Sequence, residues 1–106
     1  MSRPEFVEQV LSLYLTAEGT AGRISRSDRQ LVGHWYEEGV TIEEIETAFV
    51  LTMARRRFRD PALPPLDPIR SLHYFVPALG EVRAKPIPMD YVGYLRHKLA
   101  RSGDGI

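Results

Sequence analysis

The sequence predicts an all-α fold, a compact bundle of four or five helices around a central buried helix at about residues 42–58. Apolar residues recur at helical spacing in most segments, and no segment alternates apolar and polar residues as a half-buried strand does. Capping residues and glycines mark several helix starts and ends. The chain has 106 residues, 43% of them hydrophobic and 26% charged, which indicates one globular domain over residues 1–106.

The first two helices are predicted from their N-terminal capping signals. Ser2 caps a first helix, whose apolar spacing continues until Gly19. Ser25, followed three residues later by Asp28, approximates a capping box for a second helix that runs to Glu38. Capping accounts for this serine and this aspartate, because no histidine stands near them in a catalytic pattern.

The third helix is predicted to be the central one. Thr41 and Glu44 have the spacing of a capping box, so they mark its start. Its acidic residues lie in the first turn and its arginines in the last, which complements the helix dipole at both ends. Between residues 48 and 54, apolar side chains occupy almost the full circumference, and a helix that is apolar all round is buried.

The sequence after this helix is rich in proline. Three prolines between residues 60 and 67 predict a stiff loop. Asp67-Pro68 is expected to start a fourth helix, which Pro77 ends or kinks, and residues 81–89 are expected to be irregular.

A final helix is expected at the C-terminal side of the chain. Asp90 is predicted to cap it, and its apolar residues share one face through about Arg101. Residues from about 102 to 106 are expected to form a flexible tail.

Composition narrows the possible cellular context and chemistry. The chain contains no cysteine, which excludes disulfides, iron–sulfur clusters and thiolate zinc sites and fits a reducing compartment. The longest nearly apolar stretch, residues 48–54, is far too short to span a bilayer. Glu5 and Glu8 stand where a signal peptide needs a basic and an apolar region, so a cytoplasmic location without membrane attachment is expected.

Charge is sorted along the chain, which carries 14 basic and 14 acidic residues in total. Residues 1–50 contain four arginines and nine acidic residues, whereas residues 51–106 contain ten basic and five acidic residues. Two faces of opposite sign suit an anionic partner at one face and a basic partner at the other. The candidate surface for a basic protein partner is formed by Glu43, Glu44 and Glu46.

The arginines that end the central helix are the best candidates for an anion-binding surface. With basic residues farther along the chain, they are predicted to form one outward-facing positive patch, to which Tyr74, Tyr91 and Tyr94 add faces for base stacking. The alternative is that arginines at a helix C-terminus only cap carbonyl groups and offset the dipole. The candidate nucleic-acid-binding residues are Arg55, Arg56, Arg57, Arg59, Arg70, Arg96, Lys98 and Arg101.

One stretch of the chain carries a family-like pattern. It reads Trp35-Tyr36-x-x-Gly39-x-x-Ile42-x-x-Ile45-x-x-Ala48-Phe49, preceded by Asp28-x-x-Leu31. This pattern resembles the helical module of DnaD-type primosomal proteins and related uncharacterised bacterial helical domains, in which residues 69–77 also have counterparts. The resemblance covers roughly residues 25–77 and implies a bacterial, replication-linked domain that contacts single-stranded DNA and partner proteins. The chain departs from that family's closing Tyr-x-x-x-Ile-x-x-Trp segment, because Ala78 and Glu81 stand at its last two named positions.

The second and third helices also have the outline of a helix-turn-helix, with a glycine in the turn. Classical groove readout by the third helix is not expected. Three carboxylates, those of Glu43, Glu44 and Glu46, would face the DNA phosphates there and repel them.

No nucleophile–base pair or metal-binding cluster is visible in the sequence. His34, His73 and His97 lack the spacing of metal ligands, and no carboxylate pairs with them in a recognisable pattern. Each is therefore interpreted as a surface histidine or a satisfied core histidine. The protein is predicted not to be an enzyme and to hold no metal or cofactor.

These observations lead to two hypotheses of function. The leading one is a non-enzymatic bacterial module that binds single-stranded or duplex DNA, or a replication-type nucleoprotein partner, through its basic C-terminal half. The alternative is a protein-interaction or self-associating module without DNA affinity, in which the acidic and basic halves meet between chains.

Overall fold

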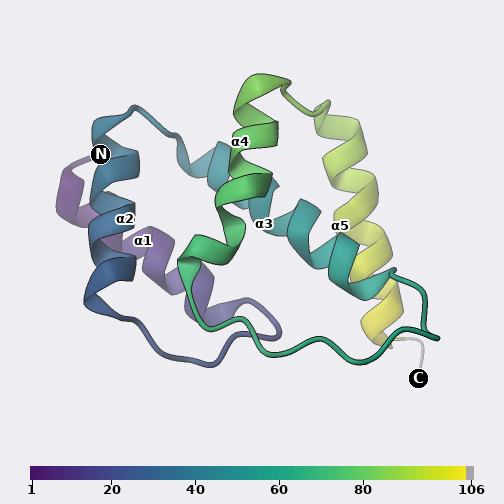
Figure 1. Cartoon of the computed structure of the whole chain (residues 1–106). Helices are drawn as coiled ribbons and strands as arrows, with labels where there is room; N and C mark the ends of the chain where they lie inside the picture. Colours follow the sequence, from purple (N-terminus) through teal and green to yellow (C-terminus); the bar gives the residue numbers. More distant parts are fainter. Residues whose placement is uncertain (105–106) are drawn as a thin grey trace.

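Helix α3 forms the axis of the domain. In the computed structural model, which describes residues 1–104 and the side chains of residues 1–101, α3 crosses the molecule with the other helices around it (Figure 1). It packs against α1, α4, α5 and the 3₁₀ helix η1. The predictions of an all-α bundle and of a central helix at about residues 42–58 are confirmed. The elements are α1 (Arg3–Thr16), α2 (Arg26–Glu37), α3 (Ile42–Arg57), η1 (Leu72–Phe75), α4 (Val76–Ala84) and α5 (Met89–Asp104).

Three of the α-helices begin with the reciprocal hydrogen bonds of a capping box. In each, the cap hydroxyl accepts from a backbone N–H three residues on, and the carboxylate of that residue accepts from the cap N–H. A cap of this kind contributes about 1 kcal/mol to stability. The pairs are Ser2 with Glu5, Ser25 with Asp28, and Thr41 with Glu44.

The segment after the proline-rich loop is extended, which corrects the prediction of a helix starting at Asp67-Pro68. Ile69 forms an isolated parallel bridge to Thr20 in the α1–α2 linker. The Ile69 N–H donates to the Gly19 carbonyl at 2.7 Å, and the Ile69 carbonyl accepts from the Ala21 N–H at 2.8 Å. Because Ile69 is buried, its backbone groups need partners inside the protein, and the linker supplies them. The long loop after α3 therefore returns along one edge of the molecule to the linker (Figure 1).

Pro77 lies at the start of a helix and does not end one. It occupies the first turn of α4, directly after η1, where a missing N–H needs no partner. Residues 81–84 continue that helix, so of the segment predicted to be irregular at residues 81–89, residues 85–88 are irregular and the remainder is helical. Leu79 and Val82 explain the difference, because they are buried and α4 packs against α3.

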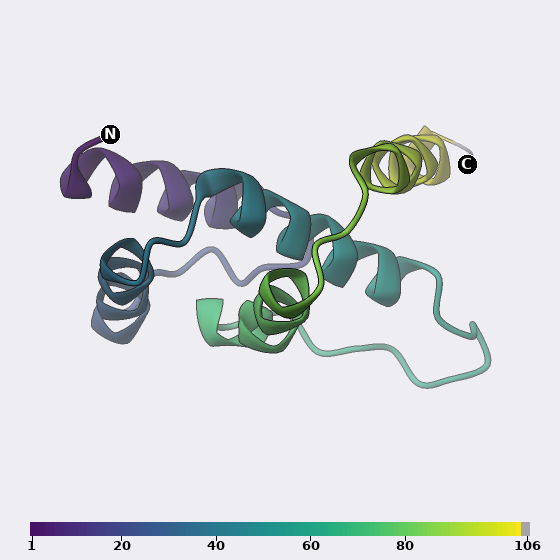
Figure 2. The same cartoon turned by 90° about the horizontal axis from the view of Figure 1, so that it is seen from above.

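Helix α5 is longer than predicted. It continues to Asp104, beyond the expected end near Arg101, and Asp90 lies within its first turn rather than at the cap. Of the expected flexible tail at about 102–106, residues 102–104 are helical and residues 105–106 lie outside the described residues. The helix packs against α3 at the end of the molecule opposite the N-terminus (Figure 2).

The core lies where α1, η1 and α4 meet α3, and α2 covers it by packing against α1 and η1. The Phe75 ring stacks on Phe49 with centroids 4.2 Å apart and meets Tyr14 edge-on at 6.2 Å. Trp35 is buried in this core, and Tyr36 is half-buried beside it. None of the described helices combines the length and the apolar composition that crossing a membrane requires.

Candidate functional site

The three consecutive arginines at the end of α3 diverge. Successive helical residues point about 100° apart, so they cannot all face one ligand. Both Nη atoms of Arg55 donate to the Glu81 carboxylate on α4, at 2.6 and 2.8 Å. Arg57 donates to the Glu18 carboxylate beyond α1. Arg56, between them, donates to the Tyr74 hydroxyl and to the Asp67 carbonyl, each at 3.0 Å.

The bidentate pair between Arg55 and Glu81 shifts the ionisation of both groups. The hydrogen bonds from Arg55 hold the pKa of the Glu81 carboxyl below its usual value, and those same bonds raise the pKa of Arg55. The guanidinium of Arg55 therefore has its own carboxylate partner.

Several other ion pairs join the acidic and basic halves of the chain to each other. Arg83 on α4 lies 4.0 Å from Glu38 and 3.5 Å from Glu44, and Arg96 on α5 lies 3.6 Å from Glu46. The acidic and basic halves thus meet within one chain. Of the three residues predicted to receive a basic partner, Glu43 is exposed, whereas Glu44 and Glu46 contact arginines of the same molecule.

A cavity of about 500 Å³ lies beside the C-terminal end of α3 and is rich in arginine; we call it the arginine cavity. Among the described residues, none that lines it is acidic. Its cations come from α3 and from Arg59, two residues after the end of that helix. Its aromatic and imidazole rings come from η1, and its apolar wall comes from α4 and the loop. Its lining residues are Thr52, Arg55, Arg56, Arg59, Leu66, His73, Tyr74, Pro77 and Ala78.

Two further cavities adjoin the arginine cavity, and we call the three together the furrow. A second cavity of about 500 Å³ shares Tyr74 with the first, and a third of about 700 Å³ shares Pro68 and Arg70 with the second. The pairing of residues 19–21 with Ile69 creates this continuity, because it brings the linker against the segment that precedes η1. The second cavity is lined by Asp67, Pro68, Arg70, Ser71 and Tyr74, and the third by Thr20, Ala21, Arg23, Ile24, Ser25, Pro68 and Arg70.

The furrow carries four arginines that have no carboxylate partner among the described side chains: Arg23, Arg56, Arg59 and Arg70. Arg59 donates to the Pro64 carbonyl at 2.6 Å, so its partner, like those of Arg56, is neutral. Within the described part of the chain, the carboxylate that lines these three cavities is Asp67. A further cavity of about 450 Å³ lies on the other side of Arg56 and Arg59, shares both with the arginine cavity, and is also lined by Glu18 and Asp60. The furrow is therefore a positively charged depression.

The eight residues predicted to bind nucleic acid thus fall into separate groups. Arg56, Arg59 and Arg70 lie together in the furrow, and Arg55 borders it while paired with Glu81. Arg57 and Arg96 contact carboxylates instead.

Lys98 and Arg101 belong to a different place, a cavity of about 420 Å³ on α5 that shares no lining residue with the furrow. The Lys98 ammonium lies 4.3 Å from the centroid of the Phe58 ring there. The predicted residues therefore line two separate positive regions, the furrow and the α5 cavity, and not one patch.

Sequence reasoning missed Arg23. It lies in the acidic half of the chain, far in sequence from the other cations of the furrow. Its place depends on the backbone pairing between the linker and Ile69, and no motif in the sequence signals that pairing.

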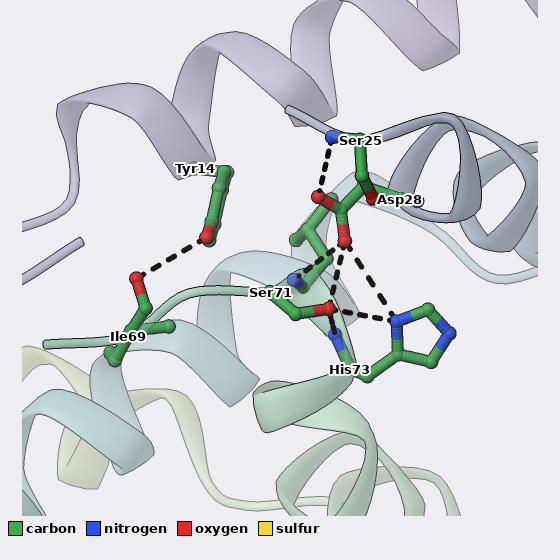
Figure 3. Close-up of polar contacts among 7 residues, drawn as sticks. Tyr14, Ser25, Asp28, Ile69, Ser71 and His73 are labelled. Atoms are coloured by element: carbon green, nitrogen blue, oxygen red, sulfur yellow. Dashed lines mark hydrogen bonds and ion pairs between the residues drawn. The ribbon is translucent and has the colours of Figure 1, made fainter. Parts of the chain in front are cut away.

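A buried polar cluster lies next to the furrow, centred on Asp28 (Figure 3). Asp28 is fully buried, and its Oδ2 accepts from the Ser25 N–H at 2.9 Å. Its Oδ1 accepts from the Ser71 hydroxyl at 2.9 Å and from the Leu72 N–H at 3.0 Å. Burial opposes ionisation, but these hydrogen bonds hold the pKa of the Asp28 carboxyl below its usual value.

Two histidines have carboxylate neighbours, which corrects the prediction that none pairs with them. His34 contacts Glu38 one turn along α2, and His73 Nδ1 lies 3.8 Å from Asp28 Oδ1 and 2.9 Å from the Ser71 hydroxyl oxygen. Asp28, Ser71 and His73 have the composition of a catalytic triad, but the serine lies between the acid and the histidine. A triad needs the histidine in the middle.

Comparison of the chain with protein-family models, with curated proteins and with solved structures finds no match. The described residues contain no group of three or more side chains placed to hold a metal ion.

Proposed function

We propose that this domain binds a single nucleic-acid strand in the furrow and acts as a binding module, not as an enzyme. The observation that carries the proposal is that four arginines without carboxylate partners line three adjoining cavities, in which Asp67 is the one acidic lining residue among the described residues. Arginine is suited to phosphate, because its planar guanidinium donates two parallel hydrogen bonds.

The present partners of these arginines favour exchange with a ligand. Arg56 and Arg59 donate to a hydroxyl and to backbone carbonyls, which leave the guanidinium charge uncompensated. A phosphate oxygen is a stronger acceptor than a carbonyl because it is charged. Binding a strand also releases its condensed counterions, which adds a salt-dependent driving force.

The proposal favours a single strand over a duplex. Tyr74 is 45% exposed and lies where two cavities of the furrow meet, so a splayed base can stack against it. The first turn of α3, which a helix-turn-helix would insert into a groove, is acidic. The resemblance to DnaD-type modules supports a partner in DNA replication and a place in the bacterial cytoplasm.

A salt titration with a single-stranded oligonucleotide and the matching duplex tests this function. With four phosphate contacts, the logarithm of the single-strand affinity should fall against the logarithm of salt with a slope of about −3. The double variant R56Q/R70Q should reduce the slope to about −1.5. The control R29Q/R96Q removes the same charge from residues outside the furrow, and its slope should match that of the wild type. Absence of binding at low salt, or binding indifferent to salt, would refute the proposal.

A second candidate function, a protein-interaction or self-associating module, is favoured by the exposed face of α5. Met89, Tyr91 and Tyr94 are each at least half exposed, and the two tyrosine rings stack with centroids 6.1 Å apart. Light scattering separates the two functions. A concentration-dependent dimer that Y91K/Y94K abolishes, together with no affinity for the oligonucleotide, would favour this second function.

A further inference from the structure

His73 stands at the boundary between the buried Asp28 cluster and the furrow. Its side chain is 49% exposed and lines the arginine cavity with Arg56 and Tyr74. On its inner side, Nδ1 faces Ser71 and Asp28. The ring therefore connects a satisfied buried carboxylate with an open positive cavity.

The hydrogen bonds of the Asp28 cluster determine which nitrogen of the neutral His73 ring carries the proton. Ser71 has one hydroxyl proton, and Asp28 is the stronger acceptor for it because it is a buried carboxylate. The Ser71 oxygen is then an acceptor, which receives the His73 backbone N–H at 3.1 Å and faces Nδ1 at 2.9 Å. Nδ1 must carry a proton to complete that contact. The neutral ring consequently leaves Nε2 bare.

Protonation of Nε2 decides whether the His73 ring attracts or repels an anion in the cavity. Nε2 lies on the side of the ring away from Asp28 and Ser71 (Figure 3). In the neutral ring it offers a lone pair, which repels an anion. When protonated, it offers an N–H and a full positive charge.

We propose that His73 is a third cationic ligand of the arginine cavity, beside Arg56 and Arg59, and binds phosphate only when its Nε2 is protonated. This inference rests on the proposed function, since it assigns a ligand and a pH dependence to the same furrow. The charged groups that face the ring are Asp28 from α2 on one side and, across the cavity, Arg55, Arg56 and Arg59, of which Arg55 is paired with Glu81. A bound phosphate adds a second negative charge, so strand binding takes up a proton at His73.

Affinity for a single-stranded oligonucleotide at about pH 5.5 and about pH 8 tests the inference. The affinity at the lower pH divided by that at the higher pH should be about tenfold larger for the wild type than for H73Q. A difference of this size corresponds to one charge-assisted hydrogen bond. Glutamine does not titrate, and the backbone N–H that donates to Ser71 is retained. H97Q, a substitution of an exposed histidine in the separate α5 cavity, should keep the wild-type pH dependence.

A measurement on the wild-type protein keeps the test independent of the stability of H73Q. Adding the strand should move the NMR titration of the His73 ring protons to higher pH and leave His34 unmoved. If wild-type protein fails to bind at both pH values, the proposed function is wrong. If it binds, but H73Q shows the same pH dependence or the His73 titration does not move, this inference alone is wrong.

Discussion

Asp28 and Arg56 are both charged side chains that hold separate segments together, but their partners are of opposite kinds. Asp28 is fully buried and accepts hydrogen bonds from Ser25, Ser71 and Leu72, so each of its oxygens has exchanged water for a protein donor. Arg56 is half-buried, and its acceptors among the described residues are the neutral oxygens of Tyr74 and Asp67. Separating a buried charge from its hydrogen-bond partners costs several kcal/mol, about 3–5, because the charge is then left uncompensated in the interior. A surface guanidinium with neutral partners can exchange them for a phosphate. The first charge therefore serves the fold and the second is available to a ligand.

The largest effect on stability is expected from substitution of the buried Asp28. Replacing Asp28 by alanine removes three hydrogen bonds and leaves the Leu72 N–H without its partner in the interior. We expect a loss of about 3 kcal/mol in the free energy of unfolding, measured by chemical denaturation. The neighbouring Ser27 is exposed in the same turn, and S27A should change stability by less than about 0.5 kcal/mol. Similar losses in the two variants would mean that the Asp28 cluster does not hold α2 to η1.

The same carboxylate gives the fold a predictable response to acid. Because the pKa of folded Asp28 is below its ordinary value of 3.8, its contribution to stability is present above that value. The contribution is lost as the pH falls through the pKa of the folded state. Denaturation midpoints measured from about pH 7 down to about pH 2 should fall more steeply for the wild type than for D28N. Parallel curves would show that Asp28 titrates alike in the folded and unfolded chains.

At the furrow, the expected effect is on affinity. R56A removes a guanidinium with neutral partners and should weaken binding of a single-stranded oligonucleotide about tenfold. R55A removes an adjacent guanidinium that already has the Glu81 carboxylate, and it should change affinity by less than about twofold. Fluorescence anisotropy at low salt measures both. Equal losses would mean that the arginines act as one patch, as the sequence alone suggests.

Local signals predicted the elements of this fold better than their connections. The caps at Ser2, Ser25 and Thr41 and the all-round apolar segment of α3 depend on residues within a few positions, and the structure confirms them. Pro77 was misjudged because a proline that ends one helix looks the same as one that starts the next. The buried residues after it, Leu79 and Val82, decide between the two only once α3 is in place.

The candidate site was less predictable, because it depends on which charges meet across the chain. Arg55, Arg56 and Arg57 are adjacent and identical in the sequence, yet Glu81 and Glu18 neutralise the outer two and leave the middle one with neutral partners. No local pattern carries that information. Asp28 was correctly predicted as a cap, but its second role toward Ser71 spans 43 residues.

The smallest effect on stability is expected from an exposed ion pair, in contrast to the buried Asp28 cluster. Arg29 and Glu8 lie 3.0 Å apart between α2 and α1, and both side chains are more than half exposed. Water screens such a pair, and ordering two long side chains costs entropy. A double-mutant cycle of R29A, E8A and the combined variant should give a coupling of about 0.3 kcal/mol that fades at high salt. A coupling near that of a buried hydrogen bond would show that surface charge contributes to the stability of this domain. The ion pairs between its acidic and basic halves would then have to be counted among the contacts that stabilise the fold.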